Sequence, residues 1–103
     1  MTTFQSTELE VVRWGEARGI VAHGKPLGQA IKTLEEVTEL IDAINRNHMT
    51  DIKDAVGDIM VTLVMVCATL DISLTNCFVS AHDQIKGRKG YLRATGVFVK
   101  DEA

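Results

Sequence analysis

The sequence lacks several features that would place it in other large classes of protein. Pro26 is the only proline in 103 residues, and no repeat, low-complexity stretch or linker is visible. Acidic residues outnumber basic ones, and the net charge of −3 argues against a general nucleic-acid-binding protein. We therefore expect residues 1–103 to form a single globular domain.

No segment is apolar over the length that a membrane-spanning helix requires. The longest apolar run, residues 59–70, has twelve residues including two threonines, whereas a span needs about 20. The first residues are polar and acidic, unlike the basic and then apolar start of a secretory signal. We expect a cytoplasmic protein that does not contact a membrane.

Cysteine and histidine are scarce and poorly spaced for metal or redox chemistry. Cys67 and Cys77 form neither a metal motif nor a redox pair, and their apolar surroundings favour two buried free thiols. Free thiols fit a cytoplasmic location. No glutamate is followed three residues later by a histidine, which excludes a di-iron carboxylate bundle.

What the sequence does contain is helical periodicity. The segment 59–67 is apolar nearly all round, so a helix there needs cover from its own bundle or from a second subunit. Two patterns suggest helix starts: a capping box at Thr7 and Glu10, and an N-cap at Thr50. Another N-cap is expected at Ser73 or Thr75. The predicted helices cover residues 7–18, 27–46, 51–70 and 74–86.

The C-terminal stretch, residues 86–100, differs from the rest because it is basic and rich in glycine. Gly87, Gly90 and Gly96 favour loop structure there. Residues 96–100 alternate like a strand but are too few to build a sheet. The prediction is an all-α, oligomeric four-helix bundle with a mostly irregular basic tail, and dimer and tetramer both remain open.

Two acidic segments interrupt the apolar helices. At about 100° per residue, Glu36 and Glu39 lie close together on one flank of their helix, with Glu35 further out. On the next helix, Asp51, Asp54 and Asp58 share a face, because spacings of three, four and seven residues do so. Two such helices packed antiparallel would bring four or five carboxylates together.

Carboxylates that border a core are costly unless they are paired or bind a metal. Magnesium prefers oxygen ligands and keeps sites for water and phosphate, so the pattern suits phosphoryl chemistry. Gly57 lies in mid-helix, where glycine costs about 1 kcal/mol relative to alanine, and suggests close approach by a neighbouring helix or a ligand. The alternative is that these acidic faces are simply solvated.

Several motifs follow one another in a fixed order. They are Trp14-Gly-Glu-Ala-Arg18, Gln29-x-x-Lys32-x-x-Glu35-Glu36-x-x-Glu39-Leu40, Asp54-Ala-Val-Gly-Asp58, Ile85-Lys86-Gly-Arg88-Lys89-Gly90 and Gly96-Val-Phe98-Val-Lys100. Together they resemble the MazG-like, all-α nucleoside triphosphate pyrophosphohydrolases, especially small phage-type members, over about residues 11–100. The resemblance implies Mg²⁺-dependent hydrolysis between the α and β phosphates, with Mn²⁺ as an alternative ion, in a homodimer or homotetramer that removes surplus or non-standard nucleotides.

The same resemblance suggests which carboxylates bind metal. Glu36, Glu39 and Asp58 match the metal ligands of the family. The family usually has a glutamate three residues before the aspartate, and this chain has Ala55 there. We predict that Asp54, one residue earlier, replaces it.

Residues for water activation and substrate binding follow from the same motifs. Glu35 or Glu36 could accept the proton of the attacking water, and the sequence does not choose between them. Trp14 could stack on a base or pack in the core. Lys32 could reach phosphate or only pair along its helix. The residues expected to stabilise phosphate charge are Lys86, Arg88 and Lys100.

Two functions from different classes therefore remain. One is a nucleoside triphosphate pyrophosphohydrolase, whose turnover requires the carboxylates. The other is a non-catalytic helical oligomerisation module, whose acidic faces are solvated or hold a structural cation.

Overall fold

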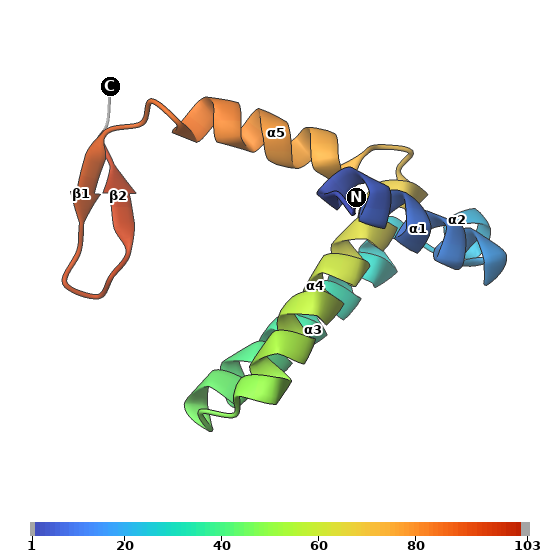
Figure 1. Ribbon diagram of the computed structural model, residues 1–103, viewed down its shortest axis with the longest axis horizontal. Coiled ribbons are helices and arrows are strands. Elements are labelled where there is room, and N and C mark those ends of the chain that lie inside the picture. The colour runs from blue at the N-terminus through green and yellow to red at the C-terminus, as the bar shows by residue number, and fades with distance from the viewer. Residues whose placement is uncertain (1, 102–103) are drawn as a thin grey trace.

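A computed structural model describes residues 2–101. Over that range the chain forms five helices followed by a two-stranded antiparallel hairpin (Figure 1). The expectation of a mainly helical protein is confirmed. The elements are α1 (Phe4–Ala17), α2 (Ile20–His23), α3 (Pro26–Asn45), α4 (Met49–Thr69), α5 (Leu74–Ile85), β1 (Gly90–Leu92) and β2 (Phe98–Lys100).

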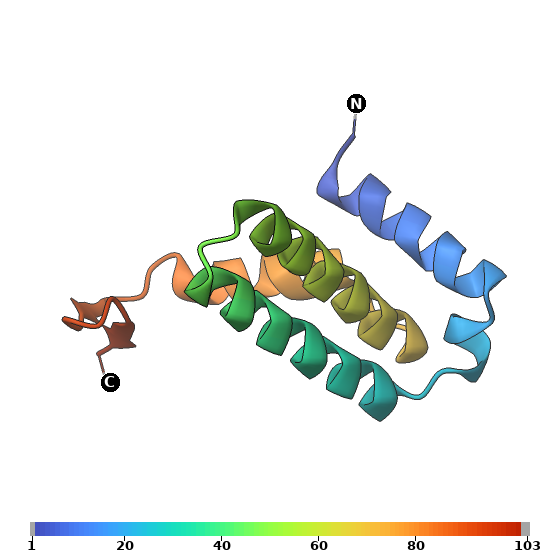
Figure 2. The ribbon, with the colours of Figure 1, turned by 90° about the horizontal axis from the view of Figure 1, so that it is seen from below.

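The longest two helices, α3 and α4, lie side by side and run antiparallel (Figure 2). A turn at 46–48 connects them. Inside this pair the Thr33 hydroxyl donates to the Thr62 hydroxyl at 2.8 Å. Ala43 and Ala55 are buried on the facing sides, and their small side chains allow the two helices to approach closely. The α3/α4 pair carries both acidic segments.

The structure corrects two predicted helix starts. Helix α1 begins at Phe4, because the capping box is formed by Thr3 and Ser6 rather than by Thr7 and Glu10. Helix α4 begins earlier than predicted because the His48 side chain, rather than Thr50, caps it by accepting from the Asp51 amide. The predicted cap at Ser73 is confirmed.

Between α1 and α3 the predicted loop contains one helical turn, α2. Gly19 precedes it with φ of 76°, in the left-handed region that favours glycine. Helix α1 crosses α4 at Gly15, where an added Cβ would overlap the buried Met65 side chain. A glycine at this crossing lets α1 lie close to α4.

The fourth predicted helix does not complete a closed four-helix bundle within one chain. Helix α5 touches α1 and α4 where it begins and then projects away from them (Figures 1 and 2). The basic tail is also more ordered than predicted, because β1 and β2 pair with Tyr91 opposite Val99. We call α5 and this hairpin, residues 74–101, the arm.

The arm is attached through Glu8 of α1, a buried carboxylate. Glu8 accepts hydrogen bonds from the Thr75 hydroxyl at 2.6 Å, from the Thr75 amide at 3.1 Å and from the Ser73 hydroxyl at 3.2 Å. It also accepts from the Leu74 amide, so it satisfies the first N–H groups of α5. Burial acts to raise the pKa of Glu8, but these hydrogen bonds outweigh it and the pKa is lowered.

The core of the described residues is small. Its buried apolar members are Ala43, Ala55, Val64, Met65 and Cys67. Cys67 is buried as expected, but Cys77 is exposed because α5 projects from the other helices. Among the described residues no single helix is long and apolar enough to cross a membrane; α4 and α5 reach that length and composition together, with a 104° bend between them.

Candidate functional site

Two cavities on the α3/α4 pair meet at Asp58. The first, of about 600 Å³, lies between α1, α3 and α4, and we call it the tryptophan cavity. The second, of about 250 Å³, lies between α3 and α4, and we call it the acidic cavity. The tryptophan cavity is lined by Trp14, Ile20, Gly28, Gln29, Lys32, Glu36, Asp58, Val61, Thr62 and Met65. The acidic cavity is lined by Glu39, Asp42, Arg46, Asp51, Asp54, Ala55 and Asp58.

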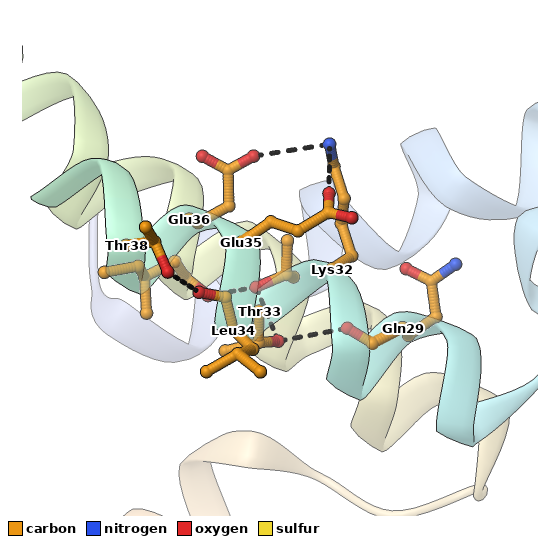
Figure 3. A network of polar contacts seen from close by, with 9 residues as sticks. Gln29, Lys32, Thr33, Leu34, Glu35, Glu36 and Thr38 are labelled. Atoms are coloured by element: carbon orange, nitrogen blue, oxygen red, sulfur yellow. Dashed lines mark hydrogen bonds and ion pairs between the residues drawn. The ribbon is translucent and has the colours of Figure 1, made fainter.

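Glu36 is the most unusual side chain of the site. It is 8% exposed, and one carboxylate oxygen, Oε1, lies 3.6 Å from the Lys32 ammonium (Figure 3). The other oxygen, Oε2, is buried and has no hydrogen-bond partner. A buried carboxylate oxygen without a donor is costly, so this position lacks a positive or donating group.

Glu39 lies one turn after Glu36, and the two carboxyl groups interact. Hydrogen bonding with Glu36, and then the negative charge of Glu36, raise the pKa of Glu39. When both groups are ionised neither can donate, which explains why Glu36 Oε2 has no partner. A proton or a cation between the two carboxylates would reduce their repulsion and would give Glu36 Oε2 a partner.

Lys32 supplies positive charge at one edge of the tryptophan cavity. Its ammonium lies 3.4 Å from the Glu35 carboxylate as well as near Glu36 (Figure 3). The hydrogen bond to Glu35 and the charges of Glu35 and Glu36 raise the pKa of Lys32, so the side chain stays protonated at neutral pH. Lys32 therefore pairs along its helix, as one of the two alternatives predicts, and it also lines the tryptophan cavity; its contact with phosphate stays a prediction.

Trp14 also lines the tryptophan cavity. Its side chain is not part of a closed core, since the residue is 43% exposed. The Arg18 guanidinium lies 4.6 Å from the indole ring centroid, in cation–π contact. A flat ring therefore lines the same cavity as Glu36 and Asp58.

Asp54 is the predicted replacement for the carboxylate that is missing at Ala55. Ala55 is buried at the α3/α4 contact, and both Ala55 and Asp54 line the acidic cavity together with Glu39 and Asp58. Over residues 2–101, however, no three Asp, Glu, His or Cys side chains are close enough to hold a metal ion as they stand. The role of Asp54 as a ligand stays a prediction.

Comparison with known proteins decides the family. Residues 28–92 match the family model of the MazG nucleotide pyrophosphohydrolase domain. The chain belongs to the MazG nucleotide pyrophosphohydrolase family. It is also 33% identical, over 66 residues, to an uncharacterized 18.2 kDa protein in the rep-hol intergenic region of Haemophilus phage HP1 (strain HP1c1). That match covers 64% of this chain and 40% of the phage protein, and no solved structure matches.

The MazG match extends over α3, α4 and α5 and therefore includes both acidic segments. It also includes Lys86 and Arg88, which the structure does not bring to the two cavities. Both follow the last residue of α5, and Lys86 pairs with Asp83 of that helix at 3.2 Å. Lys100 lies on β2, and Glu35 points to Lys32 without lining either cavity.

Two further residues of the acidic cavity could not be recognised from the sequence. Asp42 and Arg46 line the acidic cavity, and the Arg46 guanidinium bridges Asp42 at 2.9 Å and Asp51 at 3.1 Å. An Asp and an Arg four residues apart are usually an ordinary pair on a helix surface. Only the packing of α3 against α4 shows that this pair lines the cavity.

Proposed function

We propose that this protein hydrolyses ribo- or deoxyribonucleoside triphosphates between the α and β phosphates, with Mg²⁺ or alternatively Mn²⁺. Membership of the MazG family supports the general reaction. The observation that carries the metal part is the buried Glu36 oxygen without a partner, next to Glu39 with its raised pKa. These two facts describe a place where a divalent cation would stabilise the folded chain.

The proposed ligands are four carboxylates of the α3/α4 pair: Glu36, Glu39, Asp54 and Asp58. Hard oxygen ligands of this kind suit Mg²⁺, which leaves positions for water and phosphate oxygen. When bound, the metal neutralises phosphate charge and lowers the pKa of a bound water. Asp58 lines both cavities and therefore stands between the metal ligands and the space for substrate.

Water provides the oxygen for hydrolysis, and a carboxylate takes its proton. The water oxygen bonds to phosphorus as the bridging P–O bond breaks, which releases the monophosphate and pyrophosphate. Glu35 is the candidate base if Glu36 is held by metal, because its exposed carboxylate is next to Glu36 in the chain and is not among the proposed metal ligands. Glu36 takes this role if the metal is held by the other three carboxylates.

The tryptophan cavity is the proposed place for the nucleotide. Its volume of about 600 Å³ is within the range of small-molecule sites. Trp14 would stack on the base, and Lys32 would approach the phosphates at the other side. We propose nucleotide-pool cleaning in the cytoplasm as the role of this activity.

The test is a panel of canonical and modified nucleoside triphosphates with Mg²⁺, in which pyrophosphate and orthophosphate are measured separately. We expect pyrophosphate and monophosphate in equal amounts. Orthophosphate alone, or no release from any nucleotide, would contradict the proposal. In that case the exposed apolar side chains of α3, such as Leu27 and Leu34, favour the oligomerisation module instead.

A second readout does not depend on turnover. Mg²⁺ should raise the unfolding temperature of the wild-type chain, because it binds only the folded state. The increase should be absent in Asp58→Asn and retained in Asp71→Asn, an exposed carboxylate in the turn between α4 and α5. An equal increase in all three proteins would contradict a metal site at Asp58.

A further inference from the structure

The tryptophan cavity contains one polar side chain that the proposed function does not use, Gln29 of α3. Its backbone carbonyl oxygen lies 3.1 Å from the Thr33 hydroxyl. Its half-buried side-chain amide, in contrast, makes no hydrogen bond within residues 2–101 (Figure 3). Water satisfies such an amide on an open surface, so its position in the cavity decides whether it has a role. A glutamine amide offers two N–H donors and one carbonyl acceptor to a ligand.

The other polar side chains of this cavity are already engaged or assigned. Lys32 is paired with two glutamates of its own helix. The Thr62 hydroxyl accepts from the Thr33 hydroxyl at 2.8 Å and donates to the Ile59 carbonyl oxygen at 2.7 Å. The two carboxylates that line the cavity are proposed metal ligands. Within the described part of the chain, Gln29 is therefore the polar side chain left for an uncharged part of a ligand.

The two ends of the cavity differ in chemistry. The hydrogen bond between Thr33 and Thr62 shows how the antiparallel helices α3 and α4 are aligned. Residues of α3 that precede Thr33 therefore lie beside residues of α4 that follow Thr62. Gln29 and Met65 belong to these two groups and mark one end of the cavity. The two carboxylates follow Thr33 and precede Thr62, and so lie at the other end.

Trp14 lies at the end of the cavity that Met65 marks. The next residue, Gly15, crosses α4 at Met65. The Arg18 guanidinium packs on the indole ring, 4.6 Å from its centroid, but does not line the cavity, so it leaves the space beside the ring open. This end thus combines an aromatic ring, apolar side chains such as Ile20 and one amide. Sites for small organic molecules have this composition, with a few polar groups that set specificity.

The face of α3 that lines the cavity has a chemical order. Gln29, Lys32 and Glu36 are three and four residues apart, and their side chains point to one side of the helix (Figure 3). At 1.5 Å per residue, the seven residues from the first to the last cover about 10 Å. Amide, ammonium and proposed metal ligand follow one another in the order of base, phosphates and metal in a bound nucleotide.

We propose that the Gln29 amide pairs with the edge of the base that stacks on Trp14, and that it distinguishes bases by their exocyclic group. This inference rests on the proposed function and adds a specificity residue to it. The amide can donate an N–H to a keto oxygen or accept from an amino group, as amide side chains do when they read base edges. A group that can only accept would favour amino bases over keto bases.

Gln29→Glu tests this because a carboxylate only accepts hydrogen bonds. Cytidine and uridine triphosphates are compared, and adenosine and inosine triphosphates, since each pair exchanges an amino group for a keto group. The ratio of kcat/KM for the amino base over the keto base should rise about tenfold relative to wild type. Effects of the added charge on the phosphates cancel in this ratio. A rise in one pair supports contact with that class of base, and a rise in neither overturns the proposal.

Two further variants separate this contact from indirect effects. Gln5→Glu makes the same change of charge at an exposed position of α1 outside the tryptophan cavity, and should leave the ratio at its wild-type value. Gln29→Met keeps a side chain of similar size without the amide. It should lower kcat/KM for all four nucleotides and leave the unfolding temperature unchanged. An equal rise of the ratio in Gln5→Glu and Gln29→Glu would overturn the proposal.

Binding can be measured without turnover, because Trp14 is the only tryptophan and its fluorescence reports on this end of the cavity. The probes are cytidine and uridine α,β-methylene triphosphates, which cannot be cleaved between the α and β phosphates. Gln29→Glu should shift the ratio of their Kd values in favour of cytidine. Such a shift without turnover of any natural nucleotide would support the contact and reject the proposed hydrolysis. Turnover with unchanged ratios, or no quenching of Trp14 in wild type, would reject the role of Gln29.

Discussion

The α3/α4 pair and the arm are both helical in large part, yet they are stabilised in different ways. The pair buries Ala43, Ala55 and the Thr33–Thr62 hydrogen bond between two long helices. The arm buries none of the side chains of α5; it is attached by the hydrogen bonds of Glu8 and by the contact of Phe78 with Phe4. A helix-forming sequence is therefore enough to form each helix. Where a helix lies in the molecule depends on the contacts that its side chains can make.

The difference also divides the chemistry of the site. The carboxylates lie on the α3/α4 pair, where neighbouring backbone is fixed, and the predicted phosphate contacts lie on the arm. A metal site gains from rigid support, because its ligands must be held together against their mutual repulsion.

The largest expected effect is a loss of activity from a substitution in the α3/α4 pair. Asp58→Asn should reduce pyrophosphate release by about two orders of magnitude or more, because metal binding contributes several kcal/mol to catalysis. Circular dichroism and the unfolding temperature without metal should stay near wild type. Asp71→Asn is the control. Equal losses of pyrophosphate release in both variants would contradict a specific role of Asp58 in the reaction.

The next effect concerns the attachment of the arm. Glu8→Ala leaves the Leu74 and Thr75 amides without their acceptor and should lower the free energy of unfolding by about 2 kcal/mol. Glu10→Ala, two residues further along α1, removes an exposed carboxylate and serves as the control. Urea denaturation measures both. A similar small change in both variants would mean that Glu8 does not hold α5.

The same carboxylate makes stability depend on pH. The pKa of Glu8 is lower in the folded chain than its ordinary value of 4.5, so its contribution is fully present above that value. It is lost as the pH falls through the lower, folded-state pKa. Glu8→Gln should therefore show a smaller loss of stability than wild type when unfolding is measured across this acidic range.

A smaller effect distinguishes two glycines. Gly57→Ala should raise the stability of a single chain by about 1 kcal/mol, because alanine favours helix and nothing lies near the new Cβ. Gly24→Ala should destabilise, because its Cβ would overlap the Ile20 carbonyl oxygen. Urea denaturation of both variants measures the two changes in the free energy of unfolding.

The smallest effect is a difference in thiol reactivity. Cys67 is buried, and burial raises the pKa of its thiol, so alkylation should be slow in the folded chain. Cys77 is exposed on α5 and should react quickly at low protein concentration. Protection of Cys77 at high concentration, followed by mass spectrometry, would show that α5 becomes covered on assembly.

Much of the local structure could be predicted from the sequence. The apolar spacing placed α3, α4 and α5 within a few residues, because periodicity and turn residues act locally. The errors at Phe4 and Met49 arose because Thr3 and His48 capped the helices in place of the expected residues. Cap choice depends on small backbone differences that residue type alone does not specify.

The sequence by itself determined the helical class, the MazG family and the two acidic segments, since these follow from residue type and spacing. Only the tertiary structure decided that Glu36 is buried with an unpaired oxygen and that Asp58 joins two cavities. It also separated Lys86 and Arg88 from the carboxylates, because the direction of α5 is set by Glu8 and by the bend after α4. Spacing along a chain fixes which residues share a helix face, but packing between helices fixes which faces meet.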